Sequence, residues 1–326
     1  MDQRTIERFT DGIRAEALAR YGLSDAKSLG GFESFVFEGE IGGAPGVVKV
    51  TDGIRRTEEQ LLGELDFVEY LAARGAEVAR PVRSPAGKLV ESVPMPDGPP
   101  FHAYAFERAP GALTRADRMS EDEVEHYGAV TGRLHALAKD YRPSRPEWRR
   151  DDWQADWILE EKHLPEVALE RAAALLGRLD ALPRGRDEYA LLHTDLHNGN
   201  LFLHDGRLTV IDFDDCAYAW FPYDIAVVLY YAAWFSESED RSDFAARFLA
   251  SFLKGYAREN RLDPQWLGTI PDFLNFRSLV MVRVGYELLE SGASERHLQL
   301  GRRLIGAVER GEPILPLDYP SFARYL

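Results

Sequence analysis

The chain has 326 residues, one cysteine and a formal net charge of −15. This length suits two domains or one large one, and the lone Cys216 cannot close an intramolecular disulfide, so we expect a cytoplasmic protein. The acidic surplus repels phosphate backbones and anionic lipid, which excludes a general role in binding nucleic acid or membrane surfaces. The longest apolar stretch, Ile225 to Phe235, is far shorter than the ~20 residues that span a bilayer.

The N-terminal third is predicted to form an antiparallel sheet with one main helix. Between about residues 26 and 106 short apolar runs alternate with glycine-rich turns, and FVFEGEIGGAPGVVKV predicts two strands joined by a hairpin at Gly42-Gly43. In Thr57–Arg74 apolar residues recur at helical spacing, and Gly75 follows where a C-cap is expected. Further strands are predicted at Ala79–Val82, at Leu89–Val93 and in the segment FHAYAFE.

After Pro110-Gly111 the pattern becomes helical. Ser120 and Glu123 form a capping box that begins a helix running to about Ala138. Further helices are predicted at 153–182, 224–236, 243–259, 271–290 and 295–310. The chain is therefore expected to fold as two lobes, a β-rich lobe of residues 1–108 and a helical lobe of residues 109–326, with a ligand cleft between them.

One compact segment in the helical half, LLHTDLHNGNLFLHDGRLTVIDFDD, carries the densest group of polar residues. Asp195 and Asn200 lie in a glycine-bearing loop before one short strand, and Asp212 ends the next strand. Because the two strands pair across the Asp205-Gly206 turn, all three side chains return to one edge. Two carboxylates and an amide oxygen suit Mg²⁺. The alternative is an Asx-rich turn whose side chains satisfy its own backbone.

The pattern H-x-D-x-x-x-x-N followed by I-D-F-D-D resembles the catalytic loop and metal-binding aspartate of the aminoglycoside phosphotransferase and choline kinase-like family. The resemblance implies an α+β, protein-kinase-like bilobal fold with a small antiparallel-sheet N-lobe, one main N-lobe helix and a large, mostly helical C-lobe. It implies that Asp195 accepts the proton of the attacking hydroxyl, that Asn200 and Asp212 hold Mg²⁺, and that His193 braces the loop. The DLHNGN form is typical of small-molecule and bacterial branches, and there His197 is a supporting residue or a packed one.

By the same resemblance, Lys49 in the apolar strand GVVKV contacts the α- and β-phosphates of ATP and pairs with Glu64 of the following helix. The alternative for Lys49 is a charged gatekeeper on a solvated edge strand. The element P-Y-D-I-A places Asp224 at a helix start, where it would support the catalytic-loop backbone. Asp214 and Asp215 are interpreted either as neighbours of the metal or substrate or as a solvated pair at a helix N-terminus.

Two further segments are assigned to the nucleotide. The turn after Leu29 offers backbone N–H groups and a hydroxyl to the phosphates from Gly30, Gly31 and Ser34. It departs from the G-x-G-x-x-G of protein kinases, and a plain hairpin turn is the alternative. The resemblance also implies that the connector between the lobes supplies backbone donors and acceptors to the adenine edge from Phe106, Glu107 and Arg108.

Three functions follow from these residues. The first is an ATP- and Mg²⁺-dependent transfer of the γ-phosphoryl group to a hydroxyl of a small molecule, namely an aminoglycoside, amino alcohol, homoserine-like compound or sugar; the acidic C-lobe favours a cationic acceptor. The second is a bacterial Ser/Thr protein kinase of the stress-response type, which the chain resembles in R-x-T-x-x-Q-x-L-x-E, although no long segment separates Asp212 from Pro222. The third, a nucleotide-binding pseudokinase, ranks last because no key group is missing.

Overall fold

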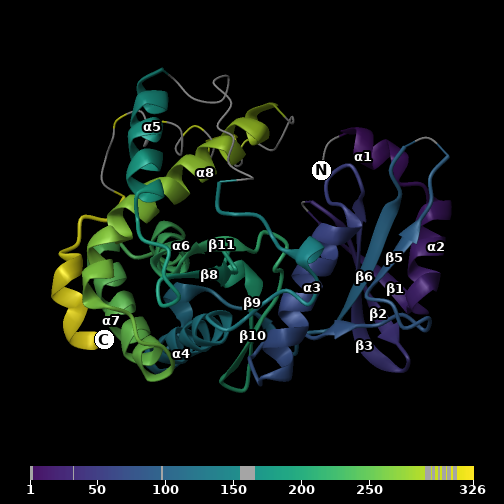
Figure 1. The fold of residues 1–326 in the computed structure, drawn as a ribbon, viewed down its shortest axis with the longest axis horizontal. Helices are drawn as coiled ribbons and strands as arrows, with labels where there is room; N and C mark the ends of the chain where they lie inside the picture. Colours follow the sequence, from purple (N-terminus) through teal and green to yellow (C-terminus); the bar gives the residue numbers. More distant parts are fainter. Residues whose placement is uncertain are drawn as a thin grey trace.

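The computed structural model of the protein describes residues 3–31, 33–96, 98–154, 166–290 and 314–326, together with six single positions between 295 and 310. Figure 1 shows a sheet with its helices on one side of the molecule and a larger, mainly helical part on the other. An antiparallel sheet with a helical C-terminal part is the predicted fold class, which is thereby confirmed.

The N-terminal sheet is antiparallel, with strand order β1-β2-β3-β6-β4 and with β5 also paired to β6. Its predicted hairpin is confirmed, because Ile41 pairs with Ala44 across Gly42 and Gly43, whose φ angles are 60° and 82°. Two positive φ angles are what a two-residue hairpin turn requires. The strands are β1 (Ser24–Gly30), β2 (Phe35–Ile41), β3 (Ala44–Asp52), β4 (Pro81–Val82), β5 (Val90–Val93) and β6 (Phe101–Glu107).

Helices cover both faces of this sheet. Val48 and Val50 of β3 are fully buried in the cluster that includes residues of α2 (Asp11–Tyr21). Because side chains alternate along a strand, Lys49 between them points to the opposite face, where α3 (Glu58–Ala73) lies and the ring of Tyr104 is 5.5 Å from its Nζ. The strand alternation therefore aims this lysine at the C-terminal part.

The helix α3 begins at the predicted residue, because Thr57 and Gln60 form a capping box. The helices α1 (Gln3–Arg8) and α2 are not among the predicted elements. In α2 only Ala17, Leu18 and Tyr21 are buried, which leaves too short an apolar stripe for the periodicity to stand out.

The C-terminal part contains helices and two small sheets, ordered β10-β9-β7 and β11-β8. Its helix α4 starts at the predicted capping box of Ser120 and Glu123. The strands are β7 (Ala112–Leu113), β8 (Tyr189–Leu192), β9 (Leu201–His204), β10 (Arg207–Val210) and β11 (Ala217–Trp220). The α-helices are α4 (Glu121–Ala138), α5 (Glu166–Asp180), α6 (Phe221–Trp234), α7 (Arg241–Glu259) and α8 (Ile270–Glu290).

Two predicted helices need comment. The start of the first at Trp153 is wrong: this residue lies in a turn and its N–H donates to Tyr218 O, so that the chain here runs beside β11. That helix is seen as α5 from Glu166, and residues 155–165 lie outside the described part. The last predicted helix, 295–310, also falls mostly outside it, and the described positions there are helical.

Two glycines bring α4 and α7 close together. A Cβ placed on Gly128 or Gly255 would overlap the backbone carbonyl of the facing helix, at Phe252 and Glu125 respectively. We expect Gly128→Ala to lower the free energy of unfolding by about 1–3 kcal/mol, because the helices must move apart. Urea unfolding measures this. The control is Gly177→Ala in α5, which meets no atom within 4 Å and is expected to stabilise by about 0.5–1 kcal/mol; equal effects of the two would contradict the prediction.

Candidate active site

The predicted catalytic loop connects β8 to β9 and is held by Asp224 at the start of α6. Thr194 has a φ of 61°, a left-handed conformation that costs energy for a β-branched residue. Its N–H donates to Asp224 Oδ1 at 2.8 Å, and its hydroxyl donates to Asp215 O at 2.6 Å. The other oxygen of Asp224 accepts from His135 Nε2 at 3.1 Å. Asp224 therefore connects the backbone of this loop to His135 of α4.

Three side chains donate to the Asp195 carboxylate. Arg277 from α8 donates to Oδ1, while His197 Nε2 and Asn200 Nδ2 each lie 3.3 Å from Oδ2. Burial would raise the pKa of Asp195, but the charge of Arg277 and the hydrogen bond from His197 outweigh it and hold the pKa well below its usual range. The carboxylate is therefore ionised at neutral pH, as a group that must accept a hydrogen bond from a hydroxyl has to be.

The two histidines of the loop have different partners. His193 Nε2 donates to Ile211 O at 3.0 Å, and its Nδ1 accepts from the N–H of Asp195, so the ring braces the loop against the strand before Asp212. His197 Nδ1 accepts from Gly199 N–H at 2.8 Å, which leaves Nε2 to donate to Asp195. The ring of His197 stacks on Tyr231 with centroids 4.3 Å apart.

The predicted metal ligands lie next to each other. Ile211 N–H donates to Asn200 O at 3.0 Å, which ties the loop to the residue before Asp212. Asn200 uses its Nδ2 on the main-chain oxygen of Asp195, at 3.1 Å, so its amide oxygen is the atom left for a cation. Asp212 has a φ of 64° and a half-exposed side chain. An amide oxygen and an accessible carboxylate are donors that fit a hard divalent cation such as Mg²⁺.

Lys49 pairs with Asp212 in this structure and forms no ion pair with Glu64. Its Nζ donates to Asp212 Oδ1 at 2.7 Å. Glu64 is fully buried, and neither of its carboxylate oxygens has a hydrogen-bond partner among the described residues. Burial raises the pKa of Glu64 to about 8, the charge of Asp214 adds to this, and Lys49 acts against it. The predicted pairing of Lys49 with Glu64 is thus absent from this structure, in which the lysine pairs with Asp212.

This buried carboxyl predicts a pH-dependent stability. Below pH 4.5 the Glu64 carboxyl is protonated in both the folded and the unfolded protein. Between pH 4.5 and about pH 8 it ionises only in the unfolded protein. The free energy of unfolding of the wild type therefore falls as the pH rises through this range. We expect Glu64→Gln to be more stable than the wild type by about 2–4 kcal/mol at pH 8 and about equal at pH 4.5. Urea unfolding at both pH values measures this. Glu69→Gln on the same helix is the control, and a difference independent of pH would contradict the prediction.

The turn between β1 and β2 requires its two glycines. Gly30 and Gly31 have φ angles of 81° and 139°, and a Cβ on Gly31 would overlap the carbonyl of Ser34. The Ser34 hydroxyl is buried and has no hydrogen-bond partner among the described residues. This geometry suits both a phosphate-binding turn and a plain hairpin, so the phosphate role of this turn stays a prediction.

The connector between the lobes is tied to the N-terminal sheet through part of its backbone. Phe106 lies inside β6, between β3 and β4. The N–H of Glu107 donates to Arg80 O at 2.8 Å, and the N–H of Arg108 donates to Pro45 O at 3.1 Å. The N–H groups of Glu107 and Arg108 are therefore engaged within the N-terminal part, and the contact of this connector with adenine stays a prediction.

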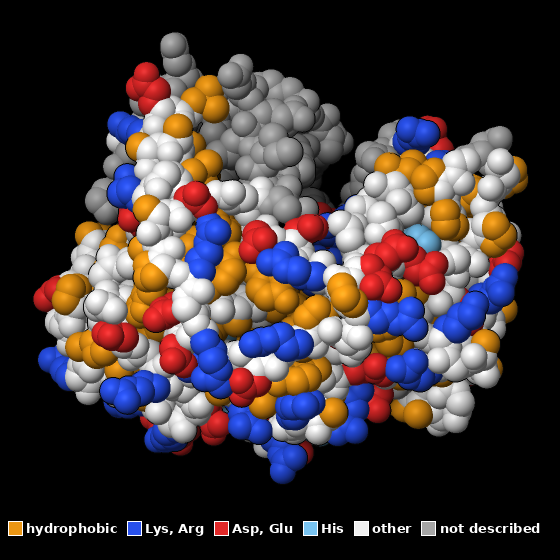
Figure 2. All heavy atoms as spheres, viewed as in Figure 1, with side chains coloured by type: hydrophobic (Ala, Val, Ile, Leu, Met, Phe, Trp, Pro, Cys, Tyr) orange, Lys and Arg blue, Asp and Glu red, His pale blue; other side chains and the backbone are white. Residues whose placement is uncertain are grey.

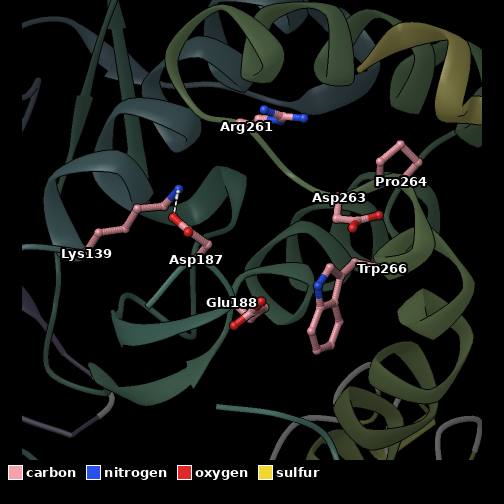
Figure 3. Close-up of a pocket in the computed structure, with 7 residues that line it drawn as sticks. All are labelled: Lys139, Asp187, Glu188, Arg261, Asp263, Pro264 and Trp266. Carbon is pink, nitrogen blue, oxygen red and sulfur yellow. Dashed lines mark ion pairs between the residues drawn. The ribbon is translucent and has the colours of Figure 1, made fainter. Parts of the chain in front are cut away.

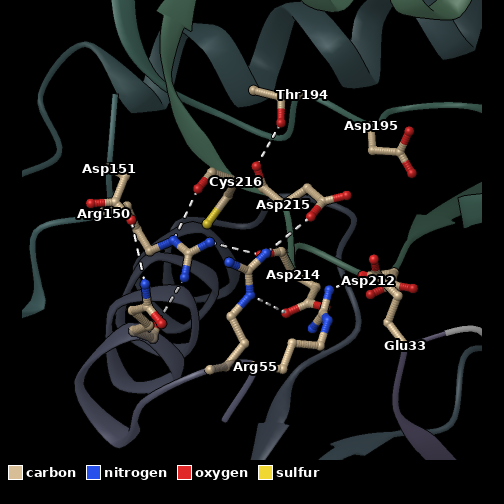
Figure 4. Close-up of polar contacts among 12 residues, drawn as sticks. Glu33, Arg55, Arg150, Asp151, Thr194, Asp195, Asp212, Asp214, Asp215 and Cys216 are labelled. Atoms are coloured by element: carbon tan, nitrogen blue, oxygen red, sulfur yellow. Dashed lines mark hydrogen bonds and ion pairs between the residues drawn. The ribbon is translucent and has the colours of Figure 1, made fainter. Parts of the chain in front are cut away.

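Several charged residues of the site were not predicted. Arg277 is an arginine within an apolar helical run, a signal that would have marked it as buried and paired. Arg150 donates to the main-chain oxygens of Asp214, at 2.7 Å, and Cys216, at 2.9 Å. Asp214 is buried and precedes β11, which corrects the alternative of a solvated pair at a helix start. Figure 4 shows these polar contacts together with Asp195 and Asp212.

A separate cavity of about 400 Å³ lies in the C-terminal part (Figure 3). It contains none of the predicted site residues, and its Lys139 Nζ pairs with Asp187 at 3.0 Å. Its lining residues are Lys139, Asp187, Glu188, Arg261, Asp263, Pro264 and Trp266.

In the part of the chain that the structure describes, no helix combines the length and apolar character needed to cross a membrane.

Comparison with known proteins shows the family. The model of the phosphotransferase enzyme family matches residues 29–263. The amicoumacin kinase of Bacillus subtilis (strain 168) is 35% identical over 320 residues, which are 95% of each chain. The solved structure of amicoumacin kinase hAmiN in complex with AMP-PNP, Ca²⁺ and Ami is similar with a TM-score of 0.93 and 33% identity, covering 99% of this chain and 100% of that one.

A microcompartment-associated aminopropanol kinase, with a TM-score of 0.72, 23% identity and coverage of 92% of this chain and 94% of that one, shares the fold. The family resemblance inferred from the catalytic-loop residues is confirmed by these matches. The chain belongs to the phosphotransferase enzyme family and is an enzyme of the kinase class.

Proposed function

We propose that this protein transfers the γ-phosphoryl group of Mg·ATP to a hydroxyl group of a small molecule. The observation that carries the proposal is the convergence of four groups from two distant segments, β3 and the hairpin segment of β9 and β10. Lys49 of β3 pairs with Asp212, Asn200 is tied to Ile211, and Asn200 also donates to Asp195. These are a phosphate-directed cation, two oxygen ligands for a metal and a carboxylate for the acceptor hydroxyl.

The nucleotide and metal parts of the proposal rest on chemistry and on a relative. The hAmiN structure, one third identical to this chain, is a complex with AMP-PNP and Ca²⁺. Asn200 and Asp212 would hold the corresponding cation here, and Mg²⁺ is the ion that hard oxygen ligands and triphosphates favour. When bound, it neutralises charge on the phosphates.

The chain's own residues supply orientation. Asp195, fixed by Arg277 and His197, is placed to accept a hydrogen bond from the acceptor hydroxyl and then its proton. In this structure Lys49 Nζ donates to an oxygen of Asp212. A cation held by Asp212 would compete for that oxygen, and the lysine would then be free to contact the phosphates and Glu64. A cytoplasmic location, where ATP is available, is part of the proposal.

The acceptor is proposed to be a small polar molecule related to amicoumacin, because the amicoumacin kinase matches along nearly the whole chain. A cationic acceptor remains part of the proposal, with one restriction. Arg277 is buried beside Asp195 and would repel an ammonium group directly next to the reacting hydroxyl. The amicoumacin kinase among the relatives favours a small-molecule acceptor over a protein substrate. Membership of a phosphotransferase family favours an active enzyme over a pseudokinase.

A turnover assay with Mg·ATP tests the proposal. Amicoumacin, 1-amino-2-propanol, homoserine, spectinomycin and casein are supplied as acceptors, and phosphorylated product is detected by mass spectrometry. A phosphorylated small molecule is the expected result. Labelled casein alone would favour the protein kinase, and no product with any acceptor together with no binding of Mg·AMP-PNP would overturn the proposed function.

A further inference from the structure

Arg55 links the turn of the N-terminal sheet to the loop that carries Asp212. Its guanidinium pairs with Glu33 in the turn between β1 and β2, and its Nη1 lies 2.7 Å from Asp214 Oδ2. Asp214 follows Asp212 by two residues. The arginine therefore lies between the two segments that the proposed function places around the phosphates of ATP (Figure 4).

The backbone of Arg55 is fixed in place. Its N–H donates to Asp52 O at 2.9 Å, and Ile54 N–H donates to the Asp52 carboxylate at 2.9 Å. Arg8 from α1 pairs with the same carboxylate. Because these contacts hold the turn in place, the backbone of Arg55 can stay fixed while its guanidinium exchanges one partner for another.

Arg55 differs in this respect from the two arginines beside it. Arg150 and Arg56 are buried, and both donate to main-chain oxygens, which are permanent partners. Arg55 is 24% exposed, and the side chains that it pairs with among the described residues are the carboxylates of Glu33 and Asp214, of which Glu33 is 42% exposed. An exposed carboxylate is a partner that a competing anion can replace at little cost.

The carboxylates around Arg55 form a negatively charged cluster that a phosphate ligand could approach only beside a positive group. Carboxylate oxygens of Glu33, Asp214 and Asp215 lie within 4.8 Å of one another. A triphosphate that approaches this cluster is repelled unless a positive group compensates, and a guanidinium binds phosphate and carboxylate with the same fork of N–H donors.

We propose that Arg55 binds the terminal phosphates of the nucleotide, and that the arginine pairs with Glu33 when no nucleotide is present. This inference rests on the proposed function, because it needs a nucleotide triphosphate in the cleft. It adds a second phosphate-directed cation to Lys49. It also gives Glu33 the role of a competitor, so the loss of Glu33 and the loss of Arg55 have opposite consequences.

Nucleotide binding measured by calorimetry tests this without turnover. Mg·AMP-PNP, Mg·ADP and AMP are titrated into the wild type, Arg55→Gln, Arg55→Lys and Glu33→Gln. We expect Arg55→Gln to weaken AMP-PNP binding by about 10- to 100-fold, ADP binding less and AMP binding not at all. Arg55→Lys is expected to recover part of the loss. Glu33→Gln is expected to bind AMP-PNP at least as tightly as the wild type.

The controls separate this role from a structural one. Arg83→Gln removes an exposed pair with Glu69 on the N-terminal part and is expected to change no affinity, and thermal melting checks that every variant is folded. If Glu33→Gln and Arg55→Gln weaken AMP-PNP binding equally, the inference is overturned, because the ion pair would then act only by stabilising the turn. Equal or absent effects of Arg55→Gln on all three nucleotides would overturn it as well. A wild type that binds none of them would overturn the proposed function itself.

Discussion

Replacing Asp195 by Asn is expected to lower kcat by about 10²- to 10⁴-fold, which is the usual contribution of a positioned general base. The amide keeps the shape of the carboxylate but accepts a hydroxyl proton poorly. Because Asp195 is proposed to contact the acceptor and not the nucleotide, the KM for ATP is expected to stay within about threefold of the wild-type value. Steady-state kinetics with the acceptor found in the turnover assay gives both numbers.

The matched control is Asp205→Asn in the turn between β9 and β10. Asp205 is 89% exposed and has a φ of 48°, a conformation that Asn tolerates, so the same chemical change there is expected to leave kcat unaltered. A second check is folding, since Asp195→Asn leaves the buried Arg277 without its ionised partner. A folded Asp195→Asn protein that keeps more than a tenth of wild-type kcat would show that Asp195 is not the base.

The elements that sequence predicts well are those whose signals are local. The hairpin at Gly42-Gly43 needs two positive φ angles that glycine supplies, and the capping boxes of α3 and α4 lie within four consecutive residues. The order of Asp195, Asn200 and Asp212 around one short hairpin is local as well, and their proximity follows from the pairing of β9 with β10.

The parts that sequence does not predict depend on contacts between distant segments. Arg277 is 82 residues from Asp195, and Arg55 is 159 residues from Asp214. No periodicity or spacing encodes such pairs. The pairing of Lys49 with Asp212 in place of Glu64 depends on the balance of burial and charge at three carboxyl groups, which only the folded arrangement sets.

The second large effect is expected at Asp212. Asp212→Asn removes the charged ligand of the proposed metal site, and we expect kcat/KM for Mg·ATP to fall by about 10²- to 10³-fold. The Mg²⁺ concentration for half-maximal activity is also expected to rise. A Mg²⁺ titration at fixed ATP, with excess over the nucleotide, separates the two effects because a metal ligand changes the midpoint as well as the maximum.

Asp212 has a second partner, and this sharpens the experiment. Removing its charge also frees Lys49, which can then be drawn toward the remaining carboxyl groups of Asp214 and Glu64, so part of the loss would come from a misplaced lysine. Lys49→Met isolates that part: it is expected to weaken nucleotide binding while the Mg²⁺ midpoint stays near the wild-type value. If Asp212→Asn leaves the midpoint unchanged and behaves like Lys49→Met, then Asp212 acts by holding the lysine, and the metal must be assigned to other oxygen ligands.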